Sequence, residues 1–229
     1  MDRQQARDLA QLMGEVTESV LWPAWRCPPG VQMHRLECRP GRGRATYHRH
    51  RPEGQQHEIV YGTLMVADKA DPAQCAGWLS AREIRHRGYW QGELSMLNLL
   101  AHTCCHEFAH LQQSLTRPRR RGQVHTRHFY RLLDDLHHCG AADRLRDALF
   151  ETARMRRLPI NPQPHRLPEP RQCLAQFAPG DPVVFGQPPA LRSGTVLRVN
   201  RKSCTVEGTG RSRGLRFRVP PSLLWHEDA

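Results

Sequence analysis

The stretch HTCCHEFAH, from His102 to His110, decides how the chain can be interpreted. In it His106 and His110 stand four residues apart, and Glu107 follows the first histidine. On an α-helix, residues four apart lie one turn above each other, so both imidazoles would project from the same face and could hold one metal ion. Glu107 would lie beside the ion, where a carboxylate can accept a proton from water. The spacing therefore predicts a zinc-binding helix with a neighbouring general base.

The surrounding residues support a long helix over residues 93–115. At 100° per residue its apolar side chains form one stripe, and both histidines of the motif lie away from the centre of that stripe. We therefore expect the helix to bury the stripe and to present the histidines to a cleft. The stripe consists of Leu97, Ala101, Cys104, Phe108, Leu111 and Leu115.

A catalytic zinc site needs three protein ligands and an open fourth position. The next predicted helix, over 125–138, supplies candidates for the third ligand. His125 lies one turn before the apolar Phe129, so we predict that it points inward and completes the set. A carboxylate from Asp134 or Asp135 remains the alternative.

Other elements follow from the same kind of pattern. Residues 4–21 and 141–156 have the period of amphipathic helices, and residues 68–92 are expected to be polar and irregular. Three strand-like runs should form one antiparallel sheet, and the last of them could pair with an extended substrate. A proline-rich linker is expected over 158–172. The strand-like runs are 31–38, 44–50 and 57–66.

The composition limits the partners and the compartment. The 229 residues carry a formal net charge of +12, and Lys69 and Lys202 are the only lysines. Such a basic chain favours polyanionic partners such as nucleic acid. Eight scattered cysteines without a CxxC pair indicate neither a disulfide framework nor a zinc ribbon. No apolar run predicts a signal core or a membrane span, so we expect no membrane partner and a cytoplasmic location, with the nucleoid as a site of association.

The residues after the linker, 173–229, predict a small all-β barrel of about five strands, because short β-rich runs alternate with glycine and proline. Between residues 192 and 218, eight cationic side chains accompany a single acidic one, Glu207. A basic surface of this kind suits phosphate backbones. A second basic cluster lies between the two metal-binding helices. The candidate nucleic-acid contacts are Arg198, Arg201, Lys202, Arg216, Arg119, Arg120 and Arg121.

The HEFAH motif followed by HTRHFYRLL resembles the SprT-like zinc metalloproteases, to which the DNA–protein crosslink protease Spartan belongs. The matching positions are His106, Glu107, His110, His125 and Phe129, while Thr126 stands where the family usually has glycine. The resemblance covers about residues 5–155. It implies an α+β fold with a minimal zincin-like domain over 1–157 and one catalytic Zn²⁺. Residues 173–229 resemble KOW- or Tudor-like, SH3-like barrels.

These observations predict a zinc endopeptidase that acts on proteins at or near DNA or another nucleic acid. Glu107 would be its general base. The competing hypothesis is a nucleic-acid-binding protein whose zinc site is structural or vestigial, and closure of the site by a fourth protein ligand would favour it. A third is a metal-dependent hydrolase with a non-peptide substrate.

Overall fold

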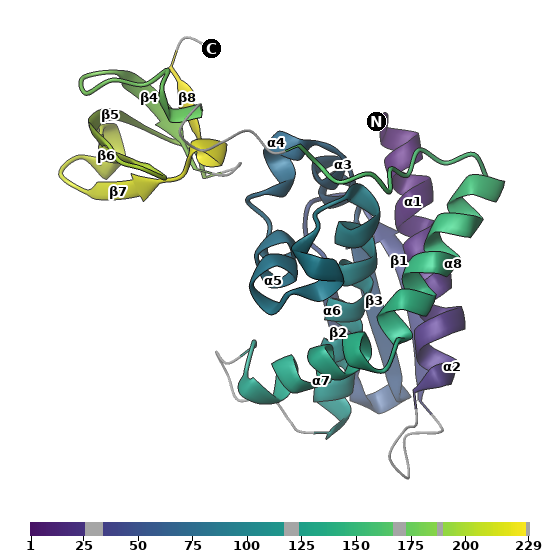
Figure 1. Ribbon diagram of the computed structural model, residues 1–229. Coiled ribbons are helices and arrows are strands. Elements are labelled where there is room, and N and C mark those ends of the chain that lie inside the picture. The colour runs from purple at the N-terminus through teal and green to yellow at the C-terminus, as the bar shows by residue number, and fades with distance from the viewer. Residues whose placement is uncertain (26–33, 117–123, 167–172, 187–189, 228–229) are drawn as a thin grey trace. The chain divides into compact units, whose positions relative to one another are not determined.

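The computed structural model describes residues 1–25, 34–116, 124–166, 173–186 and 190–227 (Figure 1). The fold is mixed α+β, and the chain divides into two compact units, Met1–His165 and Arg166–Ala229. The helices of the first unit are α1 (Arg3–Val16), α2 (Trp22–Ala24), α3 (Thr63–Ala70), α4 (Pro72–Cys75), α5 (Leu79–Arg87), α6 (Met96–Thr116), α7 (Arg127–His138) and α8 (Ala141–Met155). Its strands are β1 (Arg35–Gly41), β2 (Tyr47–Arg51) and β3 (Gln56–Gly62).

The three-stranded sheet is mixed, so the expectation of an antiparallel sheet is wrong. The strand order is β1-β3-β2, with β1 parallel and β2 antiparallel to β3. Because β3 is hydrogen-bonded on both sides, it has no edge for a substrate strand, contrary to the prediction for 57–66. Strand β2, the neighbour of β3 in this order, lies at an edge of the sheet.

A close crossing explains why β1 and β2 lie on opposite sides of β3. The segment 42–46 passes over the end of β3, where the backbone oxygen of Gly43 accepts a hydrogen bond from Leu64 N at 3.2 Å. A Cβ atom on Gly62 would lie only 2.4 Å from that same oxygen. Only glycine permits this approach, so the connection can cross the sheet and return as β2.

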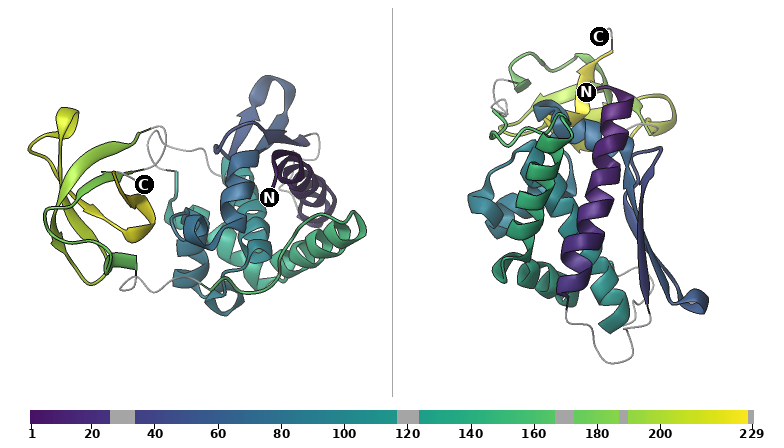
Figure 2. Two further views of the ribbon diagram at one scale, coloured as in Figure 1. Left: turned by 90° about the horizontal axis from the view of Figure 1, so that it is seen from above. Right: turned by 90° about the vertical axis from the view of Figure 1, so that its right-hand side faces the viewer.

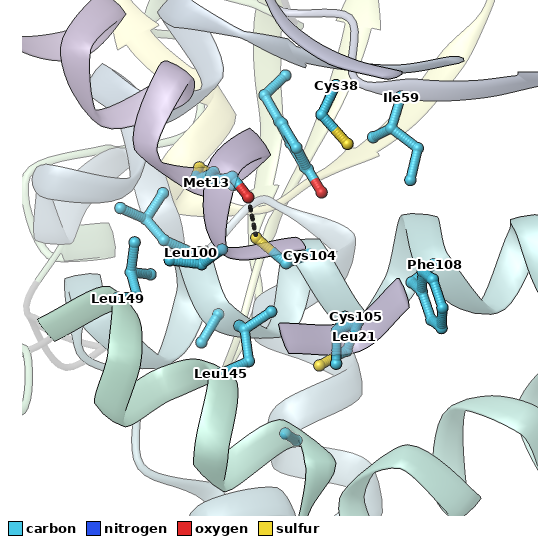
Figure 3. Close-up of a cluster of buried hydrophobic side chains, with 14 of the residues drawn as sticks. Met13, Leu21, Cys38, Ile59, Leu100, Cys104, Cys105, Phe108, Leu145 and Leu149 are labelled. Atoms are coloured by element: carbon cyan, nitrogen blue, oxygen red, sulfur yellow. Dashed lines mark hydrogen bonds between the residues drawn. The ribbon is translucent and has the colours of Figure 1, made fainter. Parts of the chain in front are cut away.

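The core of the first unit lies between the sheet and the helices. In both views of Figure 2, α1 lies between the sheet and α8. Helix α6 runs through the middle and is buried along most of its circumference. In the close-up of the core, Cys104 of α6 donates a weak hydrogen bond to the backbone oxygen of Met13, and Leu145 and Leu149 of α8 face them (Figure 3). The predicted stripe of α6 is thus buried, with Leu97, Ala101, Cys104, Phe108 and Leu111 at most 1% exposed, except for its last member, Leu115, which is partly buried.

Residues 63–92, expected to be strand and then irregular, are mostly helical. Strand β3 ends at Gly62, and α3, α4 and α5 follow. The buried side of α5 includes Ser80 and Glu83 besides Ala81 and Ile84. Because two polar residues interrupt its apolar spacing, the pattern does not show the period of a helix.

The first half of the expected linker packs on the first unit. The backbone oxygen of Asn161 accepts a hydrogen bond from Leu97 N at 3.1 Å, and His165 Nε2 lies 3.0 Å from the backbone oxygen of Lys69. Leu158 and Ile160 contact the core. The first unit therefore extends to His165.

The second unit contains a five-stranded antiparallel sheet with the order β7-β6-β5-β4-β8. Its core is small and separate, and it includes Val183, Phe185, Val196, Val206 and Leu224. The strands are β4 (Pro182–Phe185), β5 (Arg192–Val199), β6 (Cys204–Gly208), β7 (Arg216–Val219) and β8 (Leu224–His226).

Candidate metal centre

Three histidines converge at the C-terminal half of α6. His106 and His110 lie on α6, His125 lies just before α7, and one ring nitrogen of each is within 4.8 Å of the others. The Nε2 atoms of His106 and His125 are 3.2 Å apart. The ring centroids are 4.8, 5.0 and 5.1 Å apart. Imidazoles bound to one tetrahedral zinc ion have nitrogens ~3.3 Å and centroids ~5 Å apart, because each Zn–N bond is about 2.0–2.1 Å. The donor set and its spacing therefore fit one zinc ion.

The start of α7 holds His125 near α6. His125 is exposed and precedes the helix, so it does not lie on the inward stripe of α7 as expected. The next residue, Thr126, caps α7 by accepting a hydrogen bond from Phe129 N at 3.2 Å. The same hydroxyl accepts one from Gln113 Nε2 of α6 at 2.9 Å. The cap thus ties the two helices together directly beside His125.

Phe129 is the apolar floor of the centre. It is fully buried, and its ring centroid lies 4.9 Å from that of His106, 4.3 Å from that of His110 and 5.0 Å from that of His125. Close packing of this kind restricts the rotamers of the three imidazoles. It therefore prearranges them around a common point.

The alternative ligands Asp134 and Asp135 are placed elsewhere. Asp134 accepts two hydrogen bonds from Arg87, at 2.8 and 2.5 Å, and one from Tyr89 at 2.5 Å. Burial would raise the pKa of Asp134, but the hydrogen bonds from Arg87 and Tyr89 outweigh it and lower that pKa. Asp135 lines a separate hollow with Trp25 and Gln112. Among the described residues, only His125 completes a three-histidine set with His106 and His110.

Glu83 of α5 fixes the tautomer of His106. Its Oε2 atom lies 2.9 Å from His106 Nδ1 and 2.9 Å from His102 Nε2. Burial opposes ionisation of Glu83, but the hydrogen bonds from both histidines hold its pKa well below the usual range. A carboxylate can only accept, so His106 carries its proton on Nδ1 and turns the Nε2 lone pair toward His125. A carboxylate behind a ligating histidine is a recurrent feature of zinc sites.

Behind Glu83, a buried chain of polar contacts continues to α7. His102 is fully buried, and its Nδ1 lies 3.1 Å from His137 Nε2. His137 stacks on Tyr89 with the ring centroids 3.6 Å apart. Burial lowers the pKa of His102 to about 4 and that of His137 to about 3, so both are neutral near pH 7. These two histidines therefore add no positive charge behind the candidate metal centre.

A cleft of about 330 Å³ opens at the three histidines. It runs between α6 and the edge strand β2, and Tyr47, His48, Trp78 and Val124 contribute to its walls. Glu107, 6% exposed, lines the same cleft as the histidines. One carboxylate thus lies beside the candidate ligands, and the cleft leaves an open volume next to them.

Lys69 of α3 also lines this cleft. It is 1% exposed, and its ammonium group donates hydrogen bonds to Thr103 Oγ1 and, at 3.3 Å, to the backbone oxygen of Leu99. Burial lowers the pKa of Lys69 to about 7, although the nearby Glu107 and Glu83 act in the opposite direction. A buried amine that titrates near neutrality is typical of functional sites.

The candidate nucleic-acid contacts lie on the second unit, apart from three that cannot be placed. Arg119, Arg120 and Arg121 fall outside the described residues. Arg198 on β5 and Arg218 on β7 flank Thr205 of β6 in one cross-strand row, and Arg216 lies two residues before Arg218. Arg201 and Lys202 lie in the β5–β6 turn. In the described part of this unit, Arg198, Arg201, Lys202 and Arg216 are exposed and form no ion pair.

Sequence reasoning did not find Glu83, Lys69 or the capping role of Thr126. Glu83 and Lys69 lie in stretches without a clear helical period, and only their burial distinguishes them from surface charges. For Thr126, the signal is present in the sequence, because a threonine three residues before Phe129 at a helix start is a usual N-cap.

Among the described helices, none combines the length with the apolar composition that a bilayer crossing requires. Comparison of the chain with protein-family models, with curated proteins and with solved structures gives no match.

Proposed function

We propose that the first unit is a zinc-dependent endopeptidase of the SprT-like type. The observation that carries the proposal is the convergence of His106, His110 and His125 on one cleft that Glu107 also lines. A zinc ion held by these three histidines would polarise the substrate carbonyl and acidify water.

Glu107 would supply the proton transfers. As a carboxylate beside the ligands, it would accept the proton of the attacking water on one Oε atom and later donate it to the leaving amine. Glu83 would keep the Nδ1 proton on His106 throughout, because its own pKa stays far below neutrality. Phe129 would hold the three rings in place from behind.

An extended peptide would bind along β2. Among the described strands this one pairs with β3 alone, and Thr46, Tyr47 and His48 lie on the wall of the cleft. Addition of a substrate strand to a sheet edge supplies main-chain hydrogen bonds without demanding one sequence. A protein or peptide with an unfolded segment therefore suits the cleft.

The second unit would bind DNA or another nucleic acid and direct the peptidase to proteins there. Support comes from the exposed cations of β5, β7 and the β5–β6 turn, which form no ion pair in the described part of the unit. Exposed cations of this kind contact phosphates without reading bases. A cytoplasmic protein at the nucleoid would meet this description.

The test is proteolysis of an unfolded protein substrate by Zn²⁺-loaded protein, with and without DNA. We expect Glu107→Gln to keep its zinc and to lose about 100- to 10,000-fold in turnover, because general acid–base catalysis contributes on that order. Glu93→Gln, which changes an exposed glutamate before α6, is the matched control and should remain active.

Two results would contradict the proposal. Equal turnover of Glu107→Gln and the wild type would remove Glu107 from the proton transfers. Absence of cleavage by zinc-loaded wild type on every protein substrate, with DNA present, would favour a nucleic-acid-binding protein with a structural zinc site.

A further inference from the structure

A second group of histidines lies on the inner face of the sheet. His34 precedes β1, His48 and His50 belong to β2, and His57 of β3 is directly opposite His50. Arg49 and Arg51, which alternate with two of these histidines, project from the other face toward Glu58. The His48–Arg51 run therefore directs its arginines to one face of the sheet and its histidines to the other.

The imidazoles of this group touch one another. His34 Nδ1 lies 3.0 Å from His57 Nε2, and His48 Nε2 lies 2.9 Å from His57 Nδ1. The ring of His50 stacks on that of His57 with centroids 4.4 Å apart and planes inclined by 4°. His57 is fully buried, and the buried Nε2 of His50 has no hydrogen-bond partner among the described residues.

We propose that His34, His50 and His57 form a second binding site for a divalent transition-metal ion of the zinc type. One ligand nitrogen from each of the three lies within 4.8 Å of the others, as in the candidate metal centre. The ligand atoms would be Nδ1 of His34 and the Nε2 atoms of His50 and His57. The two sites share no ligand.

His48 would orient the central ligand. With the ion on Nε2, His57 carries its proton on Nδ1 and donates it to His48 Nε2, the contact of 2.9 Å already present. A partner that fixes the second nitrogen of a ligating histidine is the usual support of a metal site. His48 also lines the cleft of the candidate metal centre, so the second site abuts the wall along which the substrate is proposed to bind.

The chemistry of the three side chains favours a transition-metal ion. Neutral imidazole nitrogens are ligands that such ions bind. Nitrogen ligands without a carboxylate suit Zn²⁺, Cu²⁺ or Ni²⁺ rather than Mg²⁺ or Ca²⁺.

One rearrangement accompanies binding. The His50 ring must turn out of its parallel stack before its Nε2 lone pair can point at an ion shared with His57. The torsion between Cβ and the histidine ring has broad minima, so this ring rotation is a soft motion.

The experiment counts ions in the full-length protein and does not depend on peptidase activity. Chelator-stripped protein is titrated with Zn²⁺ by calorimetry, and the zinc retained after desalting is measured by elemental analysis. We expect two ions on the wild type, one on His34→Gln/His50→Gln, one on His106→Gln/His110→Gln, and none on the fourfold variant. His57 is left unchanged because it is fully buried, and the exposed His86→Gln is the matched control.

A thermal-shift measurement gives a second readout. Zn²⁺ should raise the melting temperature of His106→Gln/His110→Gln through the remaining site, since an ion that binds only the folded state stabilises it. The fourfold variant should show no such rise while melting cooperatively without metal. One ion on the wild type, lost in His106→Gln/His110→Gln, would overturn the proposal and leave a hydrogen-bonded imidazole stack. Two ions on His34→Gln/His50→Gln would also overturn it, by placing the second ion elsewhere.

Discussion

Glu83 shows how one carboxylate can organise a whole centre. It accepts from His106 and from His102, and each of these histidines then presents its remaining nitrogen to a defined neighbour. The HExxH spacing predicts His106, Glu107 and His110 because helix geometry alone brings four-apart residues together. Glu83 is 23 residues away from His106 in sequence, and only the packing of α5 on α6 makes them neighbours. No local pattern encodes such a contact.

Replacing the carboxylate by an amide tests this role. In Glu83→Gln the amide oxygen can still accept from both histidines, because both contacts are made to the single atom Oε2, but the side chain loses its negative charge and buries an amide nitrogen in place of Oε1. We expect the Zn²⁺ affinity of the centre to fall by roughly 10- to 100-fold, as for other residues that support metal ligands. Competition with a chromophoric chelator measures it, in the His34→Gln/His50→Gln background so that one site is observed. Glu151→Gln, on the exposed side of α8, should bind like the parent. An unchanged affinity of Glu83→Gln would show that the negative charge of Glu83 does not support the centre.

His137 should make the folded state sensitive to acid. Burial lowers its folded pKa to about 3, below the unfolded value of 6.5. Between these two pKa values the unfolded chain binds more protons than the folded chain. The stability that buried, neutral His137 contributes is therefore complete above pH 6.5 and is lost as the pH falls toward 3. Between pH 7 and pH 5 the free energy of unfolding falls by about 2 kcal/mol, because this histidine becomes protonated in the unfolded chain.

Urea unfolding in the presence of a chelator, at pH 7 and pH 5, measures this difference. In His137→Phe, which keeps a ring beneath Tyr89, the change in unfolding free energy between the two pH values should be smaller by about 2 kcal/mol. The exposed neighbour variant His138→Phe should behave like the wild type. Identical pH dependence in all three proteins would show that His137 titrates normally when folded.

At the scale of elements, periodic patterns predict α1, α6, α7 and α8, because each buries an apolar stripe against a common core. The strand runs are also placed near their observed positions, but their pairing is not. The parallel pairing of β1 with β3 depends on the crossing at Gly62, and no periodicity expresses that steric fit. Helix α5 is missed for another reason, since two of its four buried residues are polar, and the buried Glu83 pairs with His102 and His106 of α6.

The N-terminus of α7 is the element boundary on which the third ligand depends. Thr126 Oγ1 accepts from both Phe129 N and Gln113 Nε2. Thr126→Ala should destabilise the protein by about 1 kcal/mol, as other lost N-caps do. It should also weaken zinc binding, because His125 loses its anchored neighbour. Thr126→Ser keeps the hydroxyl and should restore both properties in urea unfolding and in chelator competition. Equal zinc affinity of the alanine and serine variants would show that His125 is held independently of the cap.

At the scale of the whole molecule, the short β-rich runs that follow the proline-rich segment predict a second unit. The clustering of arginines between residues 192 and 218 predicts that this unit is basic. The composition does not show that residues 158–165 complete the first unit. That assignment rests mainly on main-chain hydrogen bonds at Leu94 and Leu97, which any residue type can form, together with contacts of Leu158 and Ile160 with the core. Main-chain pairing leaves little trace in a sequence, so the boundary is visible only in the fold.

The charge of the second unit should appear in the salt dependence of DNA binding. Each phosphate contact releases condensed counterions, and the log–log slope against salt concentration is about −0.9 per contact on duplex DNA. If Arg198, Arg201 and Arg216 each contact a phosphate, replacing all three by alanine should reduce the slope by about 3. Their side chains are exposed and unpaired within the described part of the unit, so the sheet should remain folded. The matched control removes three exposed arginines of the first unit, Arg3, Arg7 and Arg42, and lowers the net charge equally. Fluorescence anisotropy of a labelled duplex at several salt concentrations distinguishes the two variants. An equal loss of slope in both would assign the binding to net charge, and an unchanged slope in the first would remove the second unit from the nucleic-acid interface.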